Sequence, residues 1–95
     1  MIVTVTPIYG NGWTDGSMTI DEPSTFQVEA EPDYRFGDIV RGTVVTQNHI
    51  LFGYKFSAAP RHNENDGAYT CTLSKPNTVG DEHNTFSGYC IVNFR

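Results

Sequence analysis

Leucine and methionine are scarce in this chain, as are helix-forming runs. Leucine occurs only at Leu51 and Leu73, and methionine only at Met1 and Met18. Because these residues are among the stronger helix formers, their scarcity argues against a helical fold. The apolar residues are mainly Phe, Tyr, Val and Ile, accompanied by many Gly, Thr and Asn. This mixture is typical of β-strands joined by turns, so the composition predicts an all-β fold with little or no helix.

Long hydrophobic runs are also missing. No stretch approaches the roughly 18 apolar residues that a membrane helix needs, so we expect no membrane partner. The first residues carry neither a basic region nor a long apolar run, so we expect no signal peptide. This leaves a host cytoplasm and a mature secreted domain open as locations. The 95 residues suffice for one domain, and we expect a single β domain over 1–95.

The chain has few basic residues. The formal net charge is −5, with 11 acidic and 6 basic residues. Residues 1–38 contain only one base, Arg35. The acids in this part are Asp15, Asp21, Glu22, Glu29, Glu31, Asp33 and Asp38. An acidic domain repels phosphates, so nucleic acid is a disfavoured partner. A protein with a basic surface is favoured, unless the carboxylates serve only solubility.

Alternating apolar and polar residues predict the first strands. In residues 26–31 the inward side chains would be Phe26, Val28 and Ala30, and the outward ones Gln27, Glu29 and Glu31. A long hairpin is predicted over about 38–58, with strands at 39–46 and 50–57. The turn would lie at Gln47-Asn48, because Asn tolerates the left-handed conformation. Its second strand would place Ile50, Phe52, Tyr54 and Phe56 on one face.

Four further strands complete the predicted fold, at 2–9, 17–20, 68–74 and 88–94. The total of six or seven strands, joined by frequent turns, favours a small antiparallel sandwich or a partly open barrel.

The two cysteines, Cys71 and Cys90, lie on the predicted inward faces of the last two strands. If these strands pair with the cysteines opposite each other, Ser74 faces Ser87 and the connecting loop is 75–86. A disulfide then requires the two Cα atoms to lie about 5.5 Å apart. Two free buried thiols are the alternative. Two cysteines alone do not identify a redox compartment.

Catalytic motifs are absent from the sequence. There is no nucleophile elbow, phosphate-binding glycine loop, HExxH or paired CxxC. The loop 61–67 is rich in oxygen and imidazole groups, but an EF-hand alignment places Leu73 where a carboxylate is required. Small secreted ribonucleases combine a His, a Glu and an Arg, but Arg61, His62 and Glu64 are too close in sequence to be expected to converge. We therefore expect no enzyme activity, metal or cofactor.

One segment resembles the first hairpin of cold-shock domains. It contains Gly42-Thr43-Val44, an Asn at 48, Phe52-Gly53-Tyr54 and Pro60. The resemblance implies base stacking by Phe52, Tyr54 and Phe56. The sequence departs from the pattern after Val44, where a lysine and exposed aromatic residues are expected. Separately, the Tyr69-Thr70-Cys71 segment resembles an immunoglobulin F strand, without the partner cysteine upstream.

A non-catalytic protein-binding module is the leading functional hypothesis. The candidate contact residues are Tyr9, Trp13, Glu29, Glu31, Asp33, Tyr34 and Phe36. Aromatic side chains with a carboxylate rim are suited to protein contact. By size and charge alone, the chain is similar to phage-encoded inhibitors of host nucleases and defence proteins, including anti-CRISPR proteins.

Three alternatives remain open from the sequence. The first is a carbohydrate- or ligand-binding module that stacks its ligand on Tyr9, Trp13 or Tyr34. The second is a virion or surface structural component that self-associates through edge strands. The third is a single-strand nucleic-acid binder that uses residues 50–56.

Overall fold

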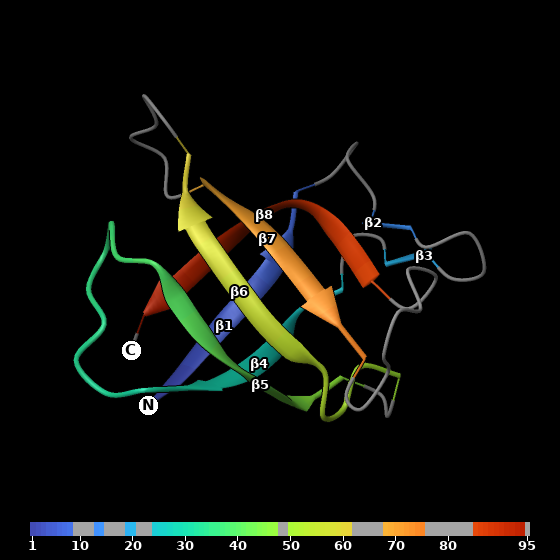
Figure 1. Ribbon diagram of the computed structural model, residues 1–95, viewed down its shortest axis with the longest axis horizontal. Helices are drawn as coiled ribbons and strands as arrows, with labels where there is room; N and C mark the ends of the chain where they lie inside the picture. The colour runs from blue at the N-terminus through green and yellow to red at the C-terminus, as the bar shows by residue number, and fades with distance from the viewer. Residues whose placement is uncertain are drawn as a thin grey trace.

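Six strands with alternating inward and outward side chains form the wall of a closed barrel (Figure 1). The computed structural model describes residues 1–8, 13–14, 19–20, 24–47, 50–61, 68–75 and 85–94. The wall strands are β1 (Ile2–Pro7), β4 (Phe26–Ala30), β5 (Val40–Thr46), β6 (Lys55–Pro60), β7 (Ala68–Ser74) and β8 (Thr85–Phe94). Two short strands, β2 (Trp13–Thr14) and β3 (Thr19–Ile20), form a separate pair.

Each wall strand is antiparallel to both of its neighbours. The order around the barrel is β1-β4-β5-β6-β7-β8, and pairing of β8 with β1 closes the ring. The all-β prediction is confirmed, and the described residues contain no helix, hence none that could span a membrane. Of the two predicted architectures the structure forms the small antiparallel barrel, and its ring is closed. Closure leaves no unpaired edge in the ring, because every wall strand has a partner on each side.

The barrel interior is filled by apolar side chains. In β4 the inward side chains are those of Phe26, Val28 and Ala30, as the alternation predicts. The same is true of Tyr69, Cys71 and Leu73 in β7. No polar or charged side chain is buried among the described residues. The interior of a six-stranded barrel is narrow enough to be filled by these apolar side chains. The described part of the chain therefore offers binding surfaces on the outside of the barrel and at its ends.

The predicted second strand of the 38–58 hairpin is wrong over 50–54. This segment makes turns, and β6 begins only at Lys55. Tyr54 N–H donates to Leu51 C=O at 2.9 Å, and Gly53 has φ 82°, a conformation that glycine adopts readily. Gly53 and Tyr54 both bond to Val44 of β5, which makes a β-bulge. The extra residue shifts the alternation, so Leu51 is buried while Ile50 and Phe52 are exposed.

The register of the cysteine strands differs from the prediction by two residues. Cys71 lies opposite Gly88, Cys90 lies opposite Tyr69, and Ser74 lies opposite Thr85 instead of Ser87. The two cysteines are therefore diagonal neighbours inside the barrel, with their Cα atoms 6.2 Å apart. This separation lies within the range of disulfides, and the structure joins the two sulfur atoms.

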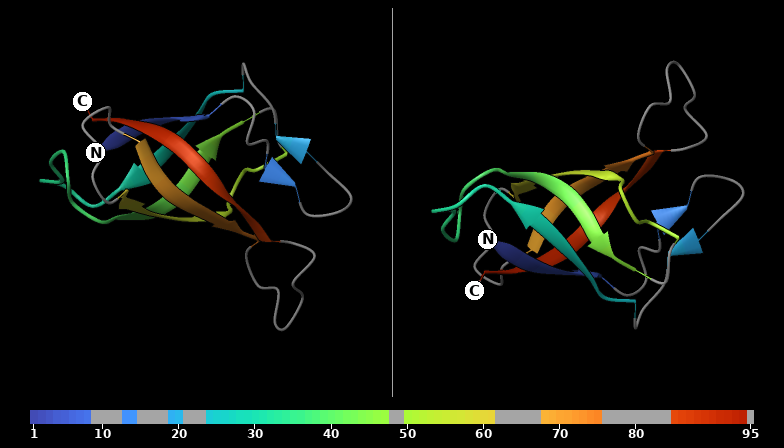
Figure 2. Two further views of the ribbon diagram at one scale, coloured as in Figure 1. Left: turned by 90° about the horizontal axis from the view of Figure 1, so that it is seen from above. Right: turned by 90° about the horizontal axis from the view of Figure 1, so that it is seen from below.

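The β2–β3 pair lies at one end of the barrel, here called the hairpin end (Figure 2). Trp13 is fully buried there, and its ring meets Phe26 edge to face at a centroid distance of 6.0 Å. A Cβ atom added to Gly88 would collide with the indole of Trp13. The missing side chain of Gly88 therefore makes the space that the indole fills. Residues 31–39 lie at the opposite end, here called the loop end.

Candidate binding surface

The predicted role of Trp13 as an exposed contact residue is wrong. Its side chain has 0% exposure, and its Nε1–H donates to the backbone oxygen of Tyr89 at 3.0 Å. Both the apolar body and the polar tip of the indole are therefore satisfied inside the protein. Sequence alone could not show this, because Gly88 lies 75 positions away in the chain. Tyr9, the other aromatic candidate from this part of the chain, lies outside the described residues.

The β4–β5 loop, residues 31–39, contains four of the predicted contact residues. Glu31, Asp33 and Phe36 are exposed and Tyr34 is half-buried. Phe36 is 61% exposed, and Ile39, which the sequence reasoning overlooked, is 53% exposed. Two exposed apolar side chains on one loop, next to carboxylates, form a surface suited to protein contact. The exposure of Ile39 could have been predicted from the sequence. Side chains alternate between the two faces of a strand, so the neighbour of the inward residue Val40 is expected to face outward.

Hydrogen bonds hold the backbone of this loop in a defined shape. Arg35 N–H donates to the Asp38 carboxylate at 2.9 Å, and Asp38 N–H donates back to Arg35 C=O at 3.0 Å. Gly37 has φ 98°, and its N–H donates to the Tyr69 hydroxyl at 2.9 Å. The loop is thus tied both to itself and to a core residue of β7.

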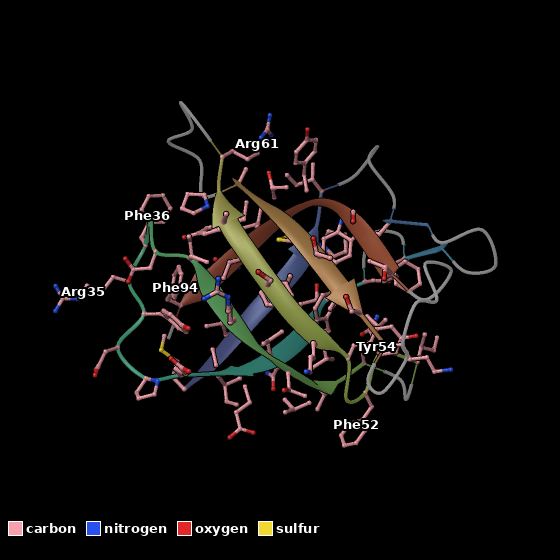
Figure 3. The ribbon with its side chains drawn as sticks, in the orientation of Figure 1. Arg35, Phe36, Phe52, Tyr54, Arg61 and Phe94 are labelled. Atoms are coloured by element: carbon pink, nitrogen blue, oxygen red, sulfur yellow. A yellow bond between two sulfur atoms is a disulfide. The ribbon has the colours of Figure 1, made fainter. Side chains whose placement is uncertain are left out.

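The ring of the exposed Phe36 packs against other aromatic rings. Its ring meets that of Tyr69 edge to face at 6.4 Å, and Tyr69 meets Phe94 at 6.2 Å. Phe36 and Phe94 lie near each other at the loop end in Figure 3. Such a stack limits the conformations that Phe36 can adopt, which lowers the entropy cost of using it in an interface.

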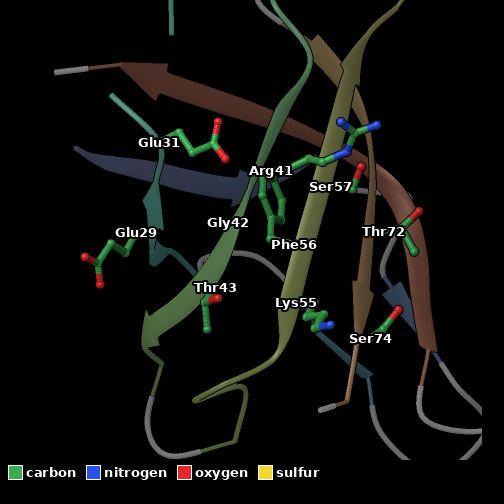
Figure 4. Close-up of a pocket in the computed structure, with 10 residues that line it drawn as sticks. All are labelled: Glu29, Glu31, Arg41, Gly42, Thr43, Lys55, Phe56, Ser57, Thr72 and Ser74. Atoms are coloured by element: carbon green, nitrogen blue, oxygen red, sulfur yellow. The ribbon is translucent and has the colours of Figure 1, made fainter. Parts of the chain in front are cut away.

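A second feature is a groove of about 400 Å³ on the outer face of β4, β5, β6 and β7 (Figure 4). Strand register arranges its outward side chains in two rows across the four strands. The first row is Glu29, Thr43, Lys55 and Ser74. The second row contains Arg41, Ser57 and Thr72, with Glu31 just beyond the end of β4. The floor between the rows is formed by Gly42 and Phe56.

The charges in this groove are sorted by strand. Both carboxylates, Glu29 and Glu31, come from the β4 side, whereas Arg41 and Lys55 come from β5 and β6. In Figure 4 the Arg41 side chain is directed from β5 toward β6, away from Glu31. Within the described part of the chain, none of these four side chains forms an ion pair. Sequence reasoning identified the two carboxylates but missed the two cations, because only strand register reveals that they share a face.

A second exposed apolar pair is formed by Ile50, which is 51% exposed, and Phe52, which is 64% exposed. Figure 3 shows Phe52 away from the loop end that carries Phe36. The cold-shock resemblance implied that Phe52, Tyr54 and Phe56 stack bases together. Instead, Tyr54 and Phe56 are buried in the core and only Phe52 faces outward. The proposed row of stacking residues is therefore not formed.

No family model matches this chain, and no curated protein or solved structure is significantly similar to it. Among the described residues, no cluster of three or more His, Cys, Asp or Glu side chains could hold a metal ion. His49, His62 and His83 lie outside the described residues.

Proposed function

We propose that this chain is a non-catalytic protein-binding module that contacts its partner through the 31–39 loop. The observation that carries the proposal is the exposure of Phe36 and Ile39 on a loop held by Tyr69 and by its own backbone. Protein interfaces gain most of their binding energy from a few apolar anchors that are already held in place. A loop presented at the end of a packed barrel meets both conditions.

The charge around these anchors supports a partner with a basic surface. Glu31 and Asp33 are exposed on the same loop, and Glu29 lies just before it on the outer face of β4. Opposite charge on the partner would steer its approach and would be felt mainly in the association rate. The proposed contact therefore combines an apolar centre with an acidic border.

The test is affinity capture from a cell lysate with two matched double variants. Phe36→Ser with Ile39→Ser removes the loop anchors, while Phe52→Ser with Ile50→Ser makes the same chemical change away from the loop end. We expect the first variant to lose its specific partner by about 30-fold in affinity, corresponding to roughly 2 kcal/mol at a hot spot. The second variant should retain the partner. The opposite pattern would refute the assignment of the surface.

A narrower proposal concerns the class of partner. Small size and a net charge of −5 favour an inhibitor of the phage type, directed at a host nuclease or defence protein whose nucleic-acid site is basic. Such a protein would compete with nucleic acid for that site. Adding the purified chain to cleavage assays of the captured partner should slow cleavage, and an unchanged rate at saturating concentration would exclude this class.

A further inference from the structure

We propose that the outer groove over β4–β7 binds an extended peptide segment that carries a basic and an acidic side chain two residues apart. The basic side chain would lie against Glu29 and Glu31, and the acidic one against Arg41 and Lys55. This inference goes beyond the proposed function, because the groove does not include the apolar anchors Phe36 and Ile39, although Glu29 and Glu31 border both surfaces.

The separation of charge across the groove defines the ligand. The carboxylates project from the β4 side, while Lys55 is on β6 and the Arg41 side chain is directed toward it. Neighbouring strands are about 4.8 Å apart, so the two charged columns are separated by roughly 10 Å. In an extended peptide, side chains at positions i and i+2 point the same way and leave the backbone about 7 Å apart. Flexible Lys and Glu side chains can cover the remaining distance.

The charges are available because they do not neutralise each other. Register places a hydroxyl opposite three of the four charged residues. Glu29 faces Thr43, Arg41 faces Ser57, and Lys55 faces Ser74. Two acids and two bases also leave the groove with no formal net charge. Nucleic acid would meet the carboxylates and be repelled, and a purely basic or purely acidic ligand would be repelled by one side of the groove.

The uncharged part of the groove suits a peptide backbone. Thr43, Ser57, Thr72 and Ser74 supply hydroxyl groups that both donate and accept hydrogen bonds. The floor at Gly42 and Phe56 carries no charge. The volume of about 400 Å³ is within the range of about 300–1,000 Å³ of sites that hold small ligands, and so accommodates a few residues.

The experiment uses the full chain and three pools of acetylated, amidated pentapeptides with the central pattern Lys-Xaa-Glu, Lys-Xaa-Gln or Gln-Xaa-Glu. Binding is followed by amide chemical shifts in NMR titrations. We expect the Lys-Xaa-Glu pool to shift the amides of Thr43, Lys55 and Ser57. Replacing either charged residue of the peptide by Gln should weaken binding about three- to fivefold, which is the size of one partly exposed ion pair.

Two paired variants complete a double-mutant cycle with the peptides. Glu29→Gln with Glu31→Gln should abolish the advantage of Lys in the peptide, whereas Arg41→Gln with Lys55→Gln should abolish the advantage of Glu. Equal binding of all three peptide pools would overturn the proposal, and so would the absence of chemical-shift changes at millimolar peptide. Equal shifts produced by inorganic phosphate or by lysine alone would also overturn it. The Phe36→Ser, Ile39→Ser variant should bind the peptides normally, so failure of the loop proposal and failure of the groove proposal are distinguishable.

Discussion

Single residues decide how the hairpin end is closed. The indole of Trp13 occupies the space in front of Gly88, where any Cβ atom would collide with it. Its Nε1–H donates to the backbone oxygen of Tyr89, which follows Gly88 in β8. The indole is therefore held both by its packing against Gly88 and by this hydrogen bond. A tryptophan and a glycine far apart in the sequence thus act as one packing unit.

Replacing Gly88 by Ala tests this unit directly. The added methyl group must displace the indole, so we expect a loss of about 1–3 kcal/mol in unfolding free energy and a red shift of tryptophan fluorescence. Chemical denaturation followed by fluorescence measures both. Ser87→Ala, on the exposed side of the same strand, is the control and should change stability by less than about 0.5 kcal/mol. An unchanged emission maximum in Gly88→Ala would show that the indole is not packed against β8.

At the scale of elements, bonds between a loop and a strand determine what the loop end presents. The Tyr69 hydroxyl accepts from Gly37 N–H, while the Tyr69 ring supports Phe36. Removal of the hydroxyl in Tyr69→Phe keeps the ring and deletes only the hydrogen bond. The shape of the 31–39 loop therefore depends on β7, although the loop connects β4 to β5.

Tyr69→Phe should cost about 1 kcal/mol of stability, the usual net value of one hydrogen bond. The more specific expectation is local: the Gly37 amide should exchange with solvent several-fold faster, while core amides such as that of Val28 change only with global stability. Hydrogen exchange followed by NMR reports both positions. If Gly37 exchange did not change, the loop would not be held by this bond.

The disulfide joins β7 to β8 and stabilises the pair that the strands already form. Its cysteines are separated by 19 positions, and a loop of this size corresponds to about 3 kcal/mol in the chain-entropy model. We expect reductant to lower the free energy of unfolding by that amount, measured by denaturation with and without dithiothreitol. The double variant Cys71→Ala, Cys90→Ala should be insensitive to reductant. Two thiols alkylated in the native protein without reductant would contradict the bond.

For the whole molecule, closure of the ring makes the barrel one cooperative structure. Every wall strand pairs with two others, and the Trp13 ring packs on Phe26 of β4 inside the same core. Trp13 fluorescence and far-ultraviolet circular dichroism should therefore lose their signals at the same denaturant concentration. Fluorescence that changed at a lower concentration would instead show that the hairpin end opens by itself, independently of the ring.

The inward and outward faces of a strand could be predicted from the sequence where apolar and polar residues alternate without interruption. The burial of Phe26, Val28 and Ala30 was predicted correctly because a strand repeats every two residues. The prediction failed at 50–54, where the bulge at Gly53 changes the phase of the alternation. It failed at Trp13 as well, because an aromatic residue between turn signals reads the same whether it faces solvent or a glycine on a distant strand.

The sequence by itself determined the class of structure: alternating apolar residues, few helix formers and frequent turn residues allow a small antiparallel β fold and little else. Only the tertiary structure decided how the ring closes, which side chains share a face and which aromatic residues reach solvent. Register is set by pairing between distant segments, and a shift of two residues, as at Cys71 and Cys90, preserves the inward faces while changing every cross-strand neighbour. The same dependence on register hid the groove, whose acidic side was visible in the sequence and whose basic side was not.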